Sequence, residues 1–289
     1  MHAVDGMPEI VRIKPLPAAI DTSAPAAPTR GSVDSYLSGI CSSLEEYYPN
    51  IRAVCSSPLV TRCVKGCKRL YSNPIRRKSP LTKDDLRLVH SALSLSHDHD
   101  DHLFLSLLLT GFHALMRLGE LVWPDQSSLR LFKKLALRHH IALEAATYSF
   151  LLPSHKADPL FEGNLVIVQA VQDSPDPRSA FALYLSSRDA LFPFRPELWL
   201  RASGTVPTRA WFVHRLRTFF PISANISGHS LRAGGATSLA EAGVPPTVIQ
   251  SLGRWSSDAW QAYIRKHPVV LNALLFSGRA LHDGPSPMH

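Results

Sequence analysis

The sequence contains few cysteines and no long apolar run, and each absence excludes a class of protein. Four cysteines in 289 residues are too few for a disulfide scaffold, which favours a reducing compartment. No stretch of about 18 apolar residues runs without a polar interruption, which excludes an ordinary membrane span. The opening MHAVDGMPEIVRIK lacks the basic segment and apolar run of a secretory leader. We therefore expect an intracellular protein with no membrane contact.

The remaining composition is that of a folded, basic protein. Hydrophobic residues make up 45% and charged residues 19%, and the length suggests roughly two domains. The net charge is +8, and residues 51–90 hold ten basic and two acidic residues, a difference equal to that whole excess. A surplus concentrated in one window indicates a surface that binds phosphate, such as that of nucleic acid. The alternative is a solvated basic linker.

Composition and periodicity divide the chain into five segments. The first is rich in Pro and Ala and is expected to be disordered, and the fourth carries most of the apolar residues. The predicted segments are a disordered tail (1–30), a partial helical domain (31–73), a basic linker (74–80), a larger domain (81–268) and a C-terminal tail (269–289).

Within the first helical domain, Ser57 and Pro58 predict a helix start, because Ser caps and Pro fits the first turn. Cys63 and Cys67 fall on its apolar side and are predicted to be buried small hydrophobes and not zinc ligands. The basic residues on another side and in the linker are candidate phosphate contacts: Arg62, Lys65, Arg69, Arg76, Arg77 and Lys78.

The larger domain is predicted to be mainly α with a small β-hairpin. An apolar helical run extends from Asp101 to Trp123, and the stretches 147–152 and 164–169 alternate as two strands around a long tip. Helical segments follow at 179–190 and 207–220, with three short helices over 226–267. The segment SHDHDDH (96–102) is interpreted as a solvated loop and not as a metal site.

Several polar residues occur where an apolar pattern does not require them. Arg117 is predicted at the end of a hydrophobic helix and is followed three residues later by Glu120. His229 and Arg232 are three apart, so at the start of a helix they share one face. The full set in chain order is Arg117, Glu120, Lys156 at the hairpin tip, His229, Arg232, Trp255 and Tyr263. The adjacent Gly234 and Gly235 are expected to allow another element to approach closely.

In this order the motifs resemble the tyrosine recombinase (phage integrase) family, and its fungal, transposon-borne Crypton-like branch in particular. The match rests on ALMRLGEL around Arg117, on the hairpin Lys156, on GHSLRAGGAT with His229 and Arg232, and on LGRWSSDAWQAYIR with Trp255 and Tyr263. It covers roughly 80–268, and 32–71 looks like the last helices of the family's core-binding domain.

The resemblance implies DNA cleavage and rejoining through a 3′-phosphotyrosyl bond to Tyr263, without metal, ATP or another cofactor. Arg117 and Arg232 would bind the non-bridging phosphate oxygens, because guanidinium forks donate two hydrogen bonds to developing negative charge. Glu120 would orient one of them. The tyrosine hydroxyl has a reference pKa near 10, so ionising it at neutral pH requires such help.

The remaining roles are also implied by the resemblance. His229 would hydrogen-bond the phosphate or accept the tyrosine proton, Trp255 would donate its indole N–H to a phosphate oxygen, and Lys156 would protonate the leaving 5′ oxygen. Double-stranded DNA is the implied partner, with self-association on DNA, a tetramer in the family, through the apolar tail. A nuclear location and a mobile element are further expectations.

Two alternatives to an active recombinase remain. The helical part from Ser32 to Tyr71 is about forty residues, shorter than a full DNA clamp needs. The first alternative is therefore a protein that keeps the fold and binds DNA without strand exchange. The second alternative is a type IB topoisomerase, which uses similar chemistry.

Overall fold

The computed structural model describes residues 30–71, 78–154, 163–172 and 175–255. The chain divides into two compact units between Arg77 and Lys78, and each unit is described by itself. None of the described helices combines the length and the apolar composition that crossing a membrane requires. The predicted disordered tail, most of the basic linker and the C-terminal tail lie outside the described residues.

The first unit contains the helices α1 (Arg30–Leu44), α2 (Ile51–Cys55) and α3 (Pro58–Tyr71). The Val60 amide donates to Ser57 Oγ over 3.5 Å, so the predicted start of the third helix is confirmed. Contacts join α1 to both α2 and α3, and an ion pair between Lys68 and Asp34 connects α1 and α3.

The predicted burial of Cys63 and Cys67 is wrong, because both side chains are exposed. Over residues 58–70, and apart from Gly66, which has no side chain, the partly buried positions of α3 are Val60, Val64 and Lys68, spaced four residues apart. Cys63 directly precedes Val64, and Cys67 directly precedes Lys68. Each cysteine therefore lies about 100° around the helix from the partly buried position beside it. In this short unit only one narrow face of α3 is covered, so an apolar residue beside that face stays in solvent.

The second unit is mainly α with a three-stranded antiparallel sheet of order β1-β2-β3, and the predicted fold class is confirmed. Its helices are α4 (Lys83–Leu93), α5 (His99–His113), α6 (Leu118–Leu121), α7 (Pro177–Leu191), α8 (Arg209–Phe219), α9 (Gly228–Glu241) and α10 (Pro246–Leu252). Short 3₁₀ turns occur at Ser127–Leu129 (η1), Phe132–Lys134 (η2), Arg138–His140 (η3) and Ile222–Ala224 (η4).

The sheet consists of β1 (Ala142–Leu143), β2 (Thr147–Leu152) and β3 (Asn164–Gln169). The two predicted hairpin strands match β2 and β3, which pair with Ser149 opposite Ile167. The two-residue β1 was not predicted, because it is too short to show alternation.

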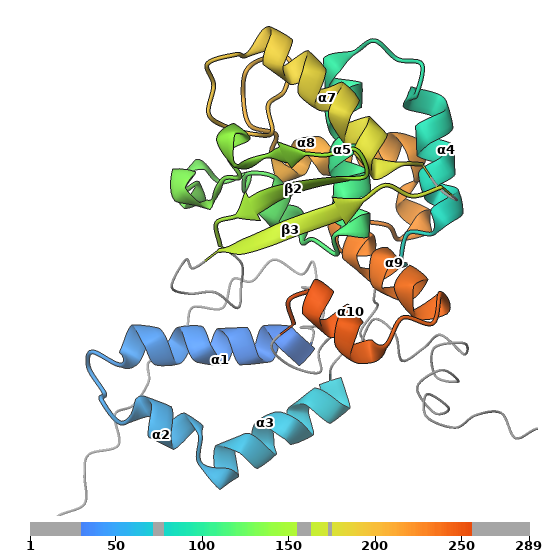
Figure 1. Cartoon of the computed structure of the whole chain (residues 1–289). Helices are drawn as coiled ribbons and strands as arrows, with labels where there is room; N and C mark the ends of the chain where they lie inside the picture. Colours follow the sequence, from blue (N-terminus) through green and yellow to red (C-terminus); the bar gives the residue numbers. More distant parts are fainter. Residues whose placement is uncertain (1–29, 72–77, 155–162, 173–174, 256–289) are drawn as a thin grey trace, which may run out of the picture. The chain divides into compact units, whose positions relative to one another are not determined.

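Helix α5 is the centre of the second unit, and α4, α7 and α9 pack against it (Figure 1). The buried face of the sheet lies on the same core. The rings of Tyr148 and Phe181 stack with centroids 4.1 Å apart, and the Tyr148 hydroxyl bonds Thr110 Oγ1 over 2.7 Å. Burial of the Tyr148 hydroxyl raises its pKa, so it remains a neutral part of the core.

The predicted helical run from Asp101 to Trp123 is broken, which corrects the placement of Arg117. Helix α5 ends at His113, Leu115 adopts a left-handed backbone with φ of 50°, and the Met116 amide donates to Gly111 O over 2.9 Å. Leu115 and Met116 are fully buried, so the turn is as apolar as the helix and the hydrophobic pattern does not reveal it. Arg117 therefore stands at the N-terminus of α6, not at the end of a long helix.

Only residues 96–98 of the segment 96–102 form a loop, with His97 and Asp98 exposed, whereas 99–102 belong to α5, which corrects the prediction of a solvated loop. Asp98 caps α5 by accepting from the amides of Asp100 and Asp101 over 2.7 and 3.1 Å. His99 and His102 are buried in the helix, where His99 Nε2 bonds Leu200 O over 2.9 Å. The described residues contain no group of three or more His, Cys, Asp or Glu arranged to hold a metal ion.

Close packing of α9 depends on the two glycines noted in the sequence. A Cβ at Gly234 would meet the backbone of Leu81, and one at Gly235 the backbone of Phe112, each closer than 3.0 Å. The expected close approach is confirmed, and it sets α9 against α5 and against Leu81, which precedes α4.

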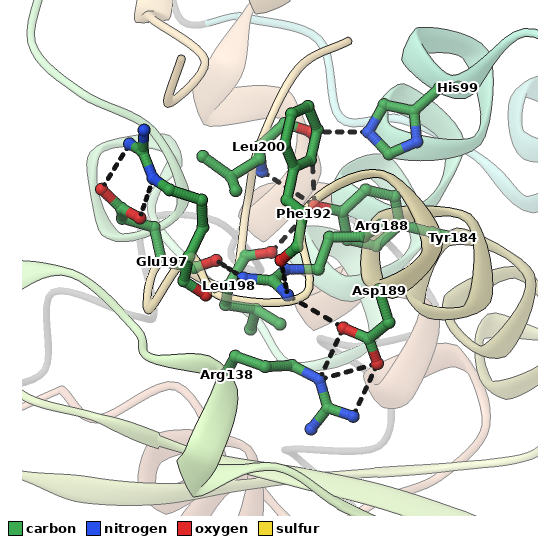
Figure 2. Close-up of polar contacts among 10 residues, drawn as sticks. His99, Arg138, Tyr184, Arg188, Asp189, Phe192, Glu197, Leu198 and Leu200 are labelled. Atoms are coloured by element: carbon green, nitrogen blue, oxygen red, sulfur yellow. Dashed lines mark hydrogen bonds and ion pairs between the residues drawn. The ribbon is translucent and has the colours of Figure 1, made fainter. Parts of the chain in front are cut away.

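A buried arginine fixes the segment that follows α7. Arg188 donates to the carbonyls of Phe192 and Glu197 over 2.9 and 2.8 Å. Figure 2 shows these residues around the end of α7. The carboxylate of Asp189 pairs with both Arg188 and Arg138, the latter over 2.7 Å. These bonds hold residues 192–200 and the 136–138 segment together on the end of α7.

Candidate functional site

A cavity of about 350 Å³ lies in the second unit, where α6, η2, the end of the hairpin, α8 and α9 meet. Its lining residues are Arg117, Leu118, Gly119, Glu120, Lys134, Ser154, Arg209, Gly228 and His229. Three of the residues predicted from the sequence, Arg117, Glu120 and His229, therefore line the same cavity. Three of the lining side chains are cationic, those of Arg117, Lys134 and Arg209, and one is acidic, so the cavity suits an anion.

Glu120 holds Arg117 from two directions. Its Oε2 accepts the Arg117 amide and its Oε1 accepts Arg117 Nη1, both over 2.9 Å. Arg254 Nη2 lies 3.4 Å from the same carboxylate, whose side chain is only 6% exposed. The single acid of the cavity is thus already paired with two arginines, and its charge does not offset the remaining cations.

His229 lies in the first turn of α9, where the helix dipole has its positive end, and Gly228 and His229 both line the cavity. Gly228 is required there, because a Cβ would collide with Leu118 of α6. Partial burial, followed by the charges of Arg209, Arg117 and Arg232, lowers the pKa of His229 below its usual value. The imidazole is therefore neutral at pH 7.

Arg232 and Trp255 pack against each other beside this site. Arg232 is 2% exposed, its guanidinium carbon lies 4.0 Å from the centroid of the Trp255 ring, and one of its nitrogens donates to Gly253 O. A cation over an indole face is favourable, the more so when desolvated. Neither residue lines the cavity, but the charge of Arg232 contributes to the lowered pKa of His229.

The other predicted site residues are not part of this cluster. Lys156, Tyr263, Arg76 and Arg77 lie outside the described residues. Lys78 belongs to the second unit, where its Nζ bonds Asn225 Oδ1 over 2.8 Å. In the first unit three exposed side chains follow one face of α3, at Arg62, Lys65 and Arg69.

Sequence reasoning missed three cations that the structure adds. Arg254 could have been proposed from the sequence, because it directly precedes the predicted site residue Trp255. Nothing in the sequence near Lys134 or Arg209 indicates a site, because they come from a 3₁₀ turn and a helix start far apart in the chain.

No protein-family profile matches the sequence, and no curated protein matches it. Solved structures do match. XerA recombinase superposes with a TM-score of 0.52 at 15% identity, over 88% of this chain and 84% of that one. The Tn1549 transposon integrase, solved with circular-intermediate DNA, gives 0.52 at 14% identity over 87% and 80%.

A third solved structure, the XerH site-specific recombinase in a post-cleavage complex, gives a TM-score of 0.50 at 15% identity, over 86% of this chain and 72% of that one. The three neighbours are recombinases or integrases. The protein therefore has the fold of the tyrosine recombinase catalytic domain, and at these identities the likeness extends to the fold alone.

Proposed function

We propose that the protein cleaves and rejoins DNA strands through a 3′-phosphotyrosyl bond to Tyr263. The observation that carries the proposal is the cavity in which Arg117, oriented by Glu120, lies together with His229. The fold shared with solved recombinases supports it, since two of the three neighbours above were solved in a DNA or cleavage complex.

The cavity suits a phosphodiester. Attack on phosphorus places extra negative charge on the two non-bridging oxygens, and fixed donors stabilise that charge without reorganising. Arg117 donates one hydrogen bond to Glu120 from Nη1 and another from its backbone amide. The other N–H donors of its guanidinium remain for a phosphate oxygen. The positive end of the α9 dipole favours the same anion.

His229, being neutral, has one ring nitrogen that donates and one that accepts. It can donate to a phosphate oxygen or accept the proton of the attacking tyrosine. The lowered pKa means that this neutral form persists to a lower pH than in an ordinary histidine. Activity that depends on it should therefore fall only at a pH below the usual histidine value.

Arg232 and Trp255 take a positioning role in this proposal. The bond from Arg232 to Gly253 O and the stacked Trp255 ring fix the turn that follows α10, and Tyr263 comes eight residues later. Lys156 protonates the leaving 5′ oxygen. Because the bond from phosphorus to that oxygen breaks as the bond to the tyrosine oxygen forms, one phosphate ester replaces another, and rejoining needs no ATP.

The finer assignments belong to the same proposal and rest on the sequence motifs. They are double-stranded DNA as partner, self-association on DNA, the Crypton-like branch, an origin in a mobile element and a nuclear location. The α3 cations Arg62, Lys65 and Arg69 provide additional phosphate contacts from the first unit.

Because the target sequence is unknown, the test uses a pool of random-sequence duplexes that carry single-strand nicks. Cleavage close to a nick releases a short 5′-hydroxyl fragment, so the covalent intermediate accumulates and survives denaturation in SDS. The wild-type protein should yield an SDS-stable adduct enriched in one sequence, and Arg117→Ala should bind the same DNA without forming it.

The outcomes separate the alternatives. DNA retained only before SDS treatment contradicts cleavage and leaves a DNA-binding protein without strand exchange. Relaxation of supercoiled plasmid without exchange between two captured sites contradicts recombination and favours the topoisomerase.

A further inference from the structure

Two cations of the cavity have no role in the chemistry described above. Lys134 ends the turn η2 and Arg209 begins α8, and both side chains are exposed at the cavity wall. Within the described part of the chain, neither side chain makes a hydrogen bond or ion pair. The one acid of the cavity is occupied by Arg117 and Arg254, so the charges of Lys134 and Arg209 are not balanced by it.

The backbone that carries Lys134 is held in place. Lys134 N donates to Leu131 O over 2.9 Å, and two residues later Ala136 O accepts Leu198 N over 2.9 Å. Arg138 then pairs with Asp189 on α7, in the network around Arg188 (Figure 2). A lysine on an anchored turn loses less conformational freedom on binding than one on a free loop.

Arg209 is anchored as firmly. Its amide donates to Trp123 O over 2.9 Å, which ties the start of α8 to the chain leaving α6. The next amide, of Ala210, donates to Asp125 Oδ1 over 2.7 Å. The charge of Arg209 is felt inside the cavity, because it contributes more than any other charge to lowering the pKa of His229.

We propose that Lys134 and Arg209 are phosphate-binding residues that hold the DNA backbone on either side of the cleaved phosphodiester. The inference rests on the proposed function for its ligand, a DNA strand. The cleaved phosphodiester carries one negative charge, which Arg117 at the same cavity already matches. Two further anchored cations at the same cavity match two further phosphates, and they fix the register of the strand without reading its sequence.

The experiment measures duplex binding by the full-length protein against salt, with a 30-base-pair mixed-sequence duplex followed by fluorescence anisotropy from 50 to 200 mM NaCl. The test variant is K134Q/R209Q. The matched control is K133Q/R217Q, which removes two exposed cations from the same elements, η2 and α8, that do not line the cavity. The charge-conserving K134R/R209K is the third protein.

Each phosphate contact on duplex DNA contributes about −0.9 to the slope of log affinity against log salt. K134Q/R209Q should therefore have a slope shallower by about 1.8, so that over this fourfold salt range the wild type loses about twelvefold more affinity than the variant. The control and K134R/R209K should keep the wild-type slope. A wild-type slope in K134Q/R209Q, or an equal change in the control, overturns the inference.

Covalent capture on the nicked pool is run in parallel, so that the two proposals fail separately. An adduct formed by the wild type together with an unchanged slope in K134Q/R209Q overturns this inference alone. A shallower slope together with no wild-type adduct supports the phosphate contacts and contradicts cleavage. A wild type that does not bind DNA overturns both.

Discussion

At the scale of single residues, the site depends on a carboxylate shared by two arginines. Glu120 lies between Arg117 and Arg254, and burial lowers the pKa of Arg254 while Glu120 counteracts that effect. Removing one member of such a group leaves like charges facing each other in a partly buried place.

Glu120→Gln should therefore lower the free energy of unfolding by about 2 kcal/mol, since charged hydrogen bonds are lost and two cations remain close together. Urea unfolding followed by circular dichroism measures the change. The control is Asp84→Asn, which breaks an exposed ion pair with Arg87 and should cost less than roughly 0.5 kcal/mol. Equal losses in the two variants would show that Glu120 does not hold the arginines.

His113, at the end of α5, provides a test by pH. Burial, with the charge of Lys83, lowers its pKa to about 4, and its Nε2 has no hydrogen-bond partner among the described residues. Between pH 6.5 and 4 the unfolded chain binds a proton here and the folded chain does not, so stability falls as the pH falls.

The loss should reach about 3 kcal/mol at pH 4 in the wild type and be absent from His113→Gln, apart from contributions of other groups common to both. Urea unfolding at pH 7, 5.5 and 4 gives the difference between the two proteins. His214→Gln replaces an exposed histidine and should follow the wild-type profile. Parallel profiles for wild type and His113→Gln would show that His113 is not buried in the neutral form.

At the scale of elements, the position of α9 is set by contact with two backbones. Gly235→Ala places a Cβ against the carbonyl of Phe112, and a backbone atom cannot move aside as a flexible side chain does. The variant should lose about 3 kcal/mol of stability.

Thermal unfolding measures that loss, and Gly119→Ala is the control. An alanine Cβ at Gly119 meets no atom within 4 Å, so this change should leave stability equal or raise it by up to about 1 kcal/mol. If Gly235→Ala unfolds at the temperature of the wild type, the packing of α9 on α5 described above is incorrect.

Elements with a strong local pattern could be predicted from the sequence. The alternation in β2 and β3, and the start of α3 at Ser57 and Pro58, depend on neighbouring residues and were found. The break at Leu115 was missed, because a buried turn is as apolar as the helices beside it. Lys134 and Arg209 were missed for another reason: only tertiary folding brings them to the cavity.

At the scale of the whole molecule, the two units divide the proposed work. The second unit holds the cavity, and the first presents the basic face of α3. The resemblance to the family rests on the order of six residues in the sequence: Arg117, Lys156, His229, Arg232, Trp255 and Tyr263. Of these, Arg117 and His229 lie at two helix starts that the fold brings to one cavity. The chemistry then depends on a nucleophile that must reach the same cavity.

The most direct test of this account identifies the residue that becomes attached to DNA. The wild-type adduct on a nicked substrate selected from the pool is digested, and the peptide that carries the nucleotide is found by mass spectrometry. It should contain phosphotyrosine at position 263. Tyr263→Phe should bind DNA as the wild type does and form no adduct, whereas Tyr47→Phe, which changes an exposed tyrosine in the first unit, should form it normally. An adduct that persists in Tyr263→Phe, or that maps to another residue, would contradict the proposed reaction.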